Sequence, residues 1–246
     1  RRVARSRLSA VGPLAVGGVS TPPRPGERPL GRKLFAWWVL VGTLILIGFL
    51  SASAAEDDAD RSDAVYQYSF GIGGLLVYAL LIGIVLVIAR GLDYRETFAL
   101  KRPTSWKRAG ALTIGLLVAV FIVGAILEAI FHAGEEQGLD PAGWQPDRVG
   151  ALILSFLAIA VAAPLAEELT FRGLGYYLLS QFGVWAAIVI TALTFALAHG
   201  LIVGIPVFFV IGGGLALLRY QTDSLYPPIL VHMSFNGLQL VIGVFG

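Results

Sequence analysis

Three short polar motifs interrupt the apolar C-terminal part of the chain. They read EELTFR at 167–172, FALAH at 195–199 and HMSFN at 232–236. A carboxylate held near a water molecule can act as a general base, and imidazole and amide N–H groups can stabilise an oxyanion. A glutamate with two histidines is also a common catalytic zinc set. The residue types therefore indicate a site, and by themselves they leave its chemistry open.

Helical spacing sorts these polar residues into pairs. Glu168 and Arg172 are four residues apart and share one helix face. Glu167 points about 100° away from Glu168 on the same helix, so the two glutamates must have different roles. The same spacing of four recurs in two further pairs: Phe195 with His199, and His232 with Asn236.

The composition is that of a membrane protein. Of the 246 residues, 57% are hydrophobic and 14% are charged, whereas a soluble domain is nearer a quarter charged. An ionisable side chain inside a bilayer is costly, so the charges clustered at 167–172 favour a functional site. The absence of cysteine excludes disulfides, thiolate chemistry and cysteine-ligated metals.

Apolar runs long enough to cross a bilayer recur along the chain. We expect an all-α integral membrane protein, a polytopic bundle of about seven transmembrane helices. The expected spans are 34–54, 65–89, 109–131, 149–181, 184–201, 205–219 and 225–244. Pro164 should kink the fourth helix, because proline leaves a backbone carbonyl without its donor. The glycine run 212–214 should let neighbouring helices approach closely.

The connections alternate in charge and predict the topology. The connection 90–108 is basic, whereas 56–63 and 132–148 are acidic. The positive-inside rule then places the N-terminus and 90–108 in the cytoplasm. Residues 1–33, rich in Arg, Pro and Gly, predict a disordered basic tail. Three tryptophans suit anchoring at the membrane interface: Trp37, Trp38 and Trp106.

The predicted hairpins give relative depths. If helices 149–181 and 184–201 turn near Gly183, then Glu167 and His199 lie level, because each is 16 residues from the turn. The last two helices should form a similar hairpin that turns at 221–223. Counting residues outward from this turn places His232 opposite Gly212 and Asn236 opposite Phe208. The glycines should therefore leave room beside His232.

The three motifs resemble the EExxxR, FxxxH and HxxxN signatures of the CAAX prenyl endopeptidase/bacteriocin-processing (ABI, CPBP) family of intramembrane proteases. The resemblance covers about residues 163–246. It makes 149–246 the expected catalytic helical core, preceded at 34–148 by three helices without a recognised motif. It implies an all-helical membrane fold with an intramembrane polar cavity, and peptide hydrolysis by an activated water.

The resemblance also implies roles, residue by residue. Glu167 is the expected general base, and His199 is its partner in holding the water. His232 and Asn236 look like the pair that stabilises the tetrahedral oxyanion.

The remaining two charges of the first motif are expected to fix the architecture, with Arg172 bonding Glu168 bidentately. Zinc is the alternative cofactor, and its ligands would then be Glu167, His199 and His232. No HExxH sequence is present, and we favour metal-free, glutamate-type catalysis without a cofactor.

The leading interpretation is a CAAX-protease-like intramembrane endopeptidase of the bacterial plasma membrane. Its expected partners are the lipid bilayer and a peptide or protein substrate that could itself be membrane-associated; no nucleic acid is expected. Two alternatives stay open. One is a non-proteolytic membrane module for bacteriocin self-immunity or scaffolding. The other is a small transporter that uses the polar cluster as a proton relay.

Overall fold

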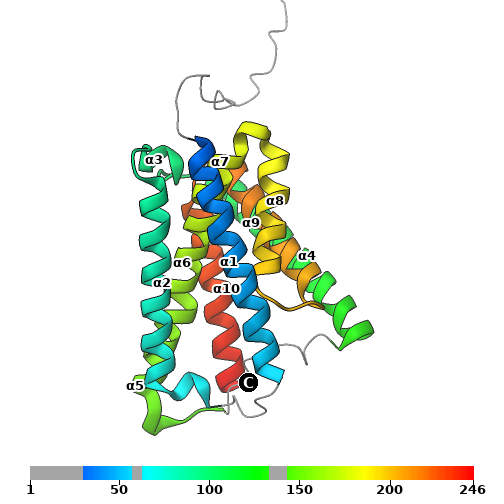
Figure 1. Ribbon diagram of the computed structural model, residues 1–246. Coiled ribbons are helices and arrows are strands. Elements are labelled where there is room, and N and C mark those ends of the chain that lie inside the picture. Colours follow the sequence, from blue (N-terminus) through cyan, green and yellow to red (C-terminus); the bar gives the residue numbers. More distant parts are fainter. Residues whose placement is uncertain (1–29, 57–62, 133–142) are drawn as a thin grey trace, which may run out of the picture.

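The computed structural model describes residues 30–56, 63–132 and 143–246 (Figure 1). Throughout these residues the regular structure is helical, without a strand. The principal helices are α1 (Leu30–Glu56), α2 (Tyr68–Ala89), α3 (Tyr94–Thr97), α4 (Trp106–Phe131), α5 (Val149–Phe156), α6 (Ala163–Glu168), α7 (Tyr176–Leu179), α8 (Val184–Ala198), α9 (Ile205–Thr222) and α10 (Tyr226–Phe245).

The predicted all-α polytopic membrane fold is confirmed. Among the described residues, six helical segments are long and apolar enough to cross a membrane, and α8 is a shorter apolar helix beside them. The fourth of the six is a continuous helical segment over Pro146–Phe182 and carries the first polar motif, so we call it the glutamate helix. Several predicted boundaries move by one to four residues: α1 begins at Leu30 instead of 34, for example, and α8 ends at Ala198 instead of 201.

The earlier start of α1 has a local cause. Lys33 lies in the first turns of α1, and its Nζ donates to the carbonyls of Ile88 at 2.7 Å and of Arg90 at 2.6 Å. These carbonyls belong to the C-terminal end of α2, where the last turn lacks helical donors. Residues 30–33 are therefore helical, and the remainder of the predicted tail, 1–29, lies outside the described residues.

Two π-helical turns interrupt the glutamate helix on either side of the glutamates. The first, η4, covers Leu157–Ala162, and the second, η5, covers Leu169–Gly175. Such turns insert an extra residue into the helical repeat and occur frequently at functional sites. The first turn ends at Ala162, two residues before Pro164, so the disturbance predicted at this proline takes the form of a π turn.

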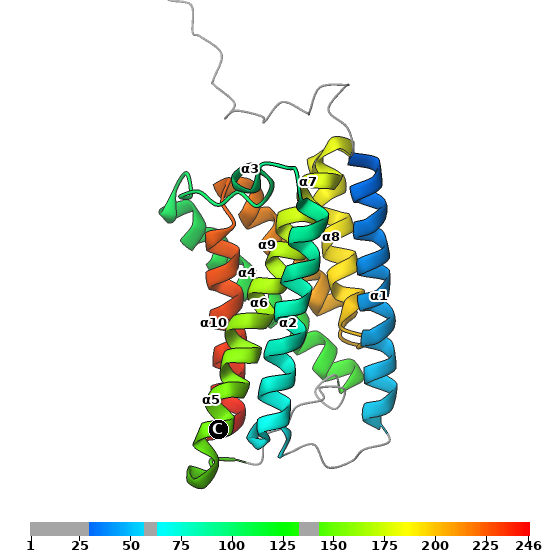
Figure 2. The same ribbon diagram turned by 60° about the vertical axis from the view of Figure 1, so that its left-hand side comes forward.

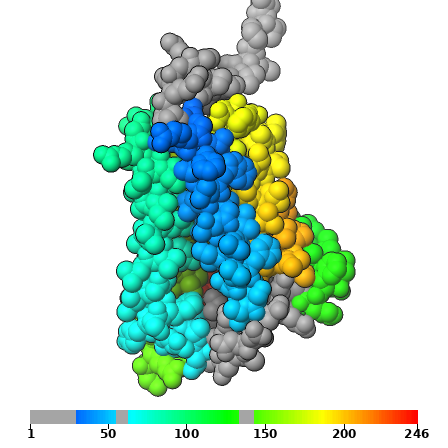
Figure 3. All heavy atoms as spheres, in the orientation of Figure 1, coloured from blue at the N-terminus to red at the C-terminus, as the bar shows by residue number. Residues whose placement is uncertain are grey.

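The glutamate helix threads through the middle of the bundle. The α5–α6 half packs against α2 and α10, and η5 and α7 pack against α1 and α8 (Figures 1 and 2). Helix α9 lies between α8 and α4, and α4 is the outermost of the three. On one face of the molecule, α1 and α2 cover most of the glutamate helix (Figure 3). On this face, two helices that carry no motif thus cover the helix that carries the two glutamates (Figure 3).

An ion pair and a hydrogen bond, together called the tie below, link the segment before α2 to the segment before α5 at one end of the bundle. The carboxylate of Asp63 accepts from Nε2 of Gln145 at 2.8 Å and from NH1 of Arg148 at 2.7 Å. These hydrogen bonds, the one from Gln145 first, hold the pKa of Asp63 below its ordinary value. The tie is largely exposed, so it contributes little to stability.

Two glycine backbones meet where α1 crosses the end of α8. A Cβ on Gly48 would overlap the carbonyl oxygen of Ala198, and one on Gly200 would overlap the carbonyl of Gly48. Gly200 also has φ +72°, a conformation that L side chains rarely adopt. The crossing fixes the backbone immediately around His199.

We expect Gly48→Ala to destabilise the protein by about 1–3 kcal/mol, because the added methyl must displace backbone atoms. Gly42→Ala in the same helix is the matched control, since nothing lies within 4 Å of its added Cβ. Alanine there should be neutral or stabilising by up to about 1 kcal/mol. Unfolding in an SDS titration measures both variants, and equal midpoints would contradict the close crossing.

Candidate functional site

A buried ion pair forms the base of the site. Glu168 and Arg172 are both fully buried, and NH1 of Arg172 donates to Oε1 of Glu168 at 2.9 Å. NH2 of Arg172 donates to the carbonyl of Gly212 on α9 at 3.0 Å. The pair is therefore monodentate, and the predicted bidentate bond is wrong: the second guanidinium nitrogen ties the glutamate helix to α9.

His232 brings α10 onto both glutamates. Its Nδ1 lies 2.9 Å from Oε1 of Glu168, the oxygen that Arg172 also bonds. Its Nε2 lies 3.6 Å from Oε2 of Glu167. One imidazole thus faces one glutamate with each nitrogen, and Nδ1–H donates to the carboxylate of Glu168.

The two glutamates differ in access. The side chain of Glu168 is 0% exposed, whereas that of Glu167 is 20% exposed. Oε2 of Glu167 has no hydrogen-bond partner among the described residues. Glu168 is consequently held by Arg172 and His232, whereas Glu167 makes a longer contact with His232 and is the more accessible of the two carboxylates.

His199 caps α8 beside this cluster. Its Nδ1 lies 2.8 Å from the carbonyl of Phe195, and a carbonyl can only accept, so Nδ1 carries the hydrogen. Nε2 of the neutral ring is left as an acceptor. The ring stacks on Phe208 with a centroid distance of 3.9 Å, and it interacts electrostatically with Glu167 and with His232.

Asn236 bonds the backbone of the glutamate helix. Among the described hydrogen bonds, its amide Nδ2 donates to the carbonyl of Ile159 in the first π turn at 3.1 Å. His232 and Asn236 share the face of α10 that packs on η4 and α6. The third motif therefore contacts the glutamate helix at two points, one on side chains and one on the main chain.

Phe195 is the aromatic centre of the cluster. The sequence predicts it beneath His199, and the two rings lie edge to face with centroids 4.6 Å apart. The guanidinium carbon of Arg172 also lies 4.2 Å from the Phe195 ring centroid, and His232 packs edge-on at 5.8 Å. The extra contacts with Arg172 and His232 come from other helices, and spacing along the chain gave no signal for them.

The glycine run 212–214 lets neighbouring helices approach closely, as predicted, but these helices are α8 and α4 and not α10, which carries His232. A Cβ on Gly212 would lie 3.0 Å from Cα of Ala192 on α8, and one on Gly214 would overlap Leu116 on α4. These glycines make room for α8 and α4. The expectation that they leave room beside His232 is therefore wrong.

The expectation that Trp37 anchors the protein at the membrane interface is wrong. It is fully buried instead of interfacial, and its Nε1 donates to the carbonyl of Thr170 in the second π turn at 2.9 Å. Gly175 lacks the Cβ that would overlap the indole. Trp38 and Trp106, by contrast, are exposed. A buried tryptophan and an interfacial one look alike in sequence, so no signal separated them.

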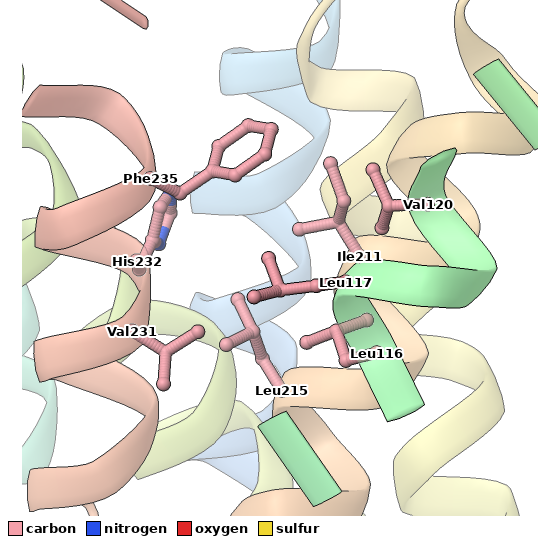
Figure 4. Close-up of a pocket in the computed structure, with 8 residues that line it drawn as sticks. All are labelled: Leu116, Leu117, Val120, Ile211, Leu215, Val231, His232 and Phe235. Carbon is pink, nitrogen blue, oxygen red and sulfur yellow. The ribbon is translucent and has the colours of Figure 1, made fainter. Parts of the chain in front are cut away.

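A small pocket adjoins the polar cluster (Figure 4). It is lined by aliphatic side chains of α4 and α9 together with Val231, His232 and Phe235 of α10. His232 is the polar side chain among the residues that line it. The resemblance implied a polar cavity, whereas the described residues place a closely packed polar cluster beside an apolar pocket.

The residues predicted as zinc ligands do not form a cage. Within the part of the chain that the structure describes, no three His, Asp or Glu side chains converge closely enough to hold a metal ion. Nε2 of His232 faces Glu167, but His199 stacks between Phe208 and Phe195. We therefore derive no step through a metal from this geometry.

Comparison with known proteins confirms the family resemblance for the C-terminal part. Residues 149–238 match the sequence model of the family described as type II CAAX prenyl endopeptidase Rce1-like, a range that contains all three motifs. An Escherichia coli protein described as an uncharacterized 24.3 kDa protein is 31% identical over 98 residues. The aligned stretch covers 37% of this chain and 45% of that protein. No solved structure matches the chain.

We expect Arg172→Met to lower the free energy of unfolding by about 3–5 kcal/mol, because it leaves the buried carboxylate of Glu168 without its cation. Adding Glu168→Gln to this variant should recover part of the loss, since the uncompensated charge is then removed. Arg148→Ala, in the exposed tie to Asp63, is the control and should change little. SDS titration measures all three, and a loss for Arg172→Met no larger than that of Arg148→Ala would contradict a structural role for the buried pair.

Proposed function

We propose that this chain, whose residues 149–238 match the Rce1-like family of type II CAAX prenyl endopeptidases, is an endopeptidase that hydrolyses peptide bonds within the membrane. One observation carries the proposal: His232 faces both a sealed Glu168, which is paired with Arg172, and a partly accessible Glu167, whose Oε2 lies 3.6 Å from Nε2 of His232. A purely structural ion pair would need Glu168 and Arg172 alone. The additional carboxylate is partly accessible, and its Oε2 accepts no hydrogen bond among the described residues, as expected of a general base.

In this proposal Glu167 accepts a proton from a water molecule. A second acceptor fixes the other hydrogen of that water, and Nε2 of His199 has the required lone pair because Nδ1–H is used on the carbonyl of Phe195. The hydroxide attacks the carbonyl carbon of the scissile peptide as the O–H bond breaks toward Glu167. The proton on Glu167 then passes to the leaving amine as the C–N bond breaks.

His232 and Asn236 are proposed to stabilise the oxyanion of the tetrahedral intermediate. Because Nδ1 of His232 bonds Glu168, Nε2 is the nitrogen that faces the reacting groups. It donates to an oxyanion when the ring is an imidazolium, whose charge Glu168 would partly offset. The amide of Asn236 has two hydrogens, of which the bond to Ile159 uses one. Fixed donors of this kind accelerate acyl transfer by about 10²–10³-fold each.

The proposed substrate is a peptide or protein that reaches the site from within or beside the bilayer. The position of the polar cluster within membrane-spanning helices supports this, because a substrate must reach His232 past the apolar side chains of α4 and α9 that lie beside it. We further propose a bacterial plasma membrane location with the N-terminus in the cytoplasm, on the basis of the charge pattern of the connections. The mechanism proposed here uses a carboxylate base and needs no cofactor.

Purified protein in detergent should cleave members of a quenched fluorescent peptide library that includes a farnesylated CAAX peptide. Glu167→Gln should lower kcat by at least about 100-fold, because the amide cannot take the proton of the water. Glu96→Gln, at an exposed position of α3, is the matched control and should retain full activity. Phenanthroline should leave the rate unchanged.

Three outcomes would count against this proposal. Full activity of Glu167→Gln would remove the carboxylate from the chemistry. Inhibition by phenanthroline that added zinc reverses would make Glu167, His199 and His232 metal ligands instead. Binding of peptides without any cleavage, by protein that unfolds at the normal midpoint, would favour a non-proteolytic immunity or scaffold function.

A further inference from the structure

The first π turn leaves one backbone carbonyl without a backbone donor. In this turn the N–H of Ala163 donates to the carbonyl of Ala158, five residues earlier. The next residue is Pro164, which has no N–H. In the same register the carbonyl it would have bonded is that of Ile159. An unpaired carbonyl within an apolar bundle is costly, so it requires another donor.

Asn236 is that donor. Its Nδ2 lies 3.1 Å from the carbonyl oxygen of Ile159, across 77 positions of sequence. The close packing of α10 on the π turn makes this reach possible. The next residue, Gly237, is buried, and a Cβ there would lie 3.5 Å from Cβ of Ala160 and 3.5 Å from the ring of Phe156.

The bond to Ile159 also determines where the rest of the amide points. A primary amide carries two N–H groups in one plane, so fixing one of them on a carbonyl fixes the direction of the other. A free asparagine side chain would rotate among several orientations. Anchored in this way, Asn236 presents its second N–H in one direction only, which is what an oxyanion donor requires.

We propose that Pro164 is a positioning residue of the site: it frees the carbonyl of Ile159, and this carbonyl anchors the amide of Asn236. The catalytic part of this inference rests on the proposed function, whereas the anchoring itself does not. Pro164 also lies three residues before Glu167. The hydrogen bond from Asn236 to this π turn therefore fixes the position of the glutamates relative to α10. It does so independently of the bond between Glu168 and His232.

A thermal double-mutant cycle in detergent tests the anchoring without any assay of catalysis. Asn236→Ala should lower the unfolding midpoint by roughly 2–8 °C, because it leaves the carbonyl of Ile159 unpaired. In a Pro164→Ala background the backbone N–H of residue 164 can bond that carbonyl, so Asn236→Ala should then cost little. If Asn236→Ala does not fold, Asn236→Leu serves in its place, because it keeps the approximate size of the side chain but has neither a donor nor a charge.

Pro227→Ala is the matched control for the proline. Pro227 lies in the first turn of α10, where the missing N–H has no helical acceptor to lose. Asn236→Ala should therefore cost the same in the Pro227→Ala background as in the natural chain. Equal costs of Asn236→Ala in the Pro164→Ala and Pro227→Ala backgrounds would overturn the anchoring.

Kinetics test the positioning. Pro164→Ala should lower kcat by about 10-fold or more with little change in KM, because it releases an oxyanion donor without touching the substrate. Asn236→Ala should then add little further loss to Pro164→Ala. Unchanged kcat in a Pro164→Ala variant that passes the thermal cycle would overturn the positioning role. If the natural chain cleaves no peptide, the proposed function fails, and the thermal cycle still decides the anchoring.

Discussion

One carboxylate oxygen, Oε1 of Glu168, accepts hydrogen bonds from two helix elements of the bundle. It lies 2.9 Å from NH1 of Arg172 and 2.9 Å from Nδ1 of His232. Charges buried in an apolar bundle are tolerated only when paired, so this oxygen sets how the glutamate helix and α10 approach each other. The second amino group of Arg172 extends the network to the carbonyl of Gly212 on α9. The positions of three helices around the site are consequences of burying this one carboxylate.

The main chain of the glutamate helix also bonds neighbouring helices directly. Each of its π turns has a carbonyl bonded by a side chain from another helix: Ile159 by Asn236 of α10, and Thr170 by Trp37 of α1. The glutamates lie between these two turns. The irregular backbone on either side of the glutamates therefore sets the direction of their side chains. Two neighbouring helices stabilise this backbone: α10, inside the family-matched region, and α1, outside it.

The sequence predicted correctly those features that depend on a single helix. Apolar length predicted the spans, and spacing of four predicted the pairing of Glu168 with Arg172. It failed where separate helices meet. The single bond between Arg172 and Glu168, the burial of Trp37 and the contact of Gly212 with α8 all depend on packing. The π turns had a partial signal in Pro164, but a 3.6-residue repeat cannot show that the register slips.

The length of α8 has a consequence for the depth of the site. Its 15 residues span roughly 22 Å, whereas the hydrocarbon core of a bilayer is about 30 Å thick. A helix of this length does not cross the core from one surface to the other, so at least one of its ends lies within the hydrophobic thickness. Peptide groups can turn there only against other protein or water. The backbone of Gly48 packs against the turn after α8 at Gly200, so α1 supplies protein contact for the peptide groups next to His199.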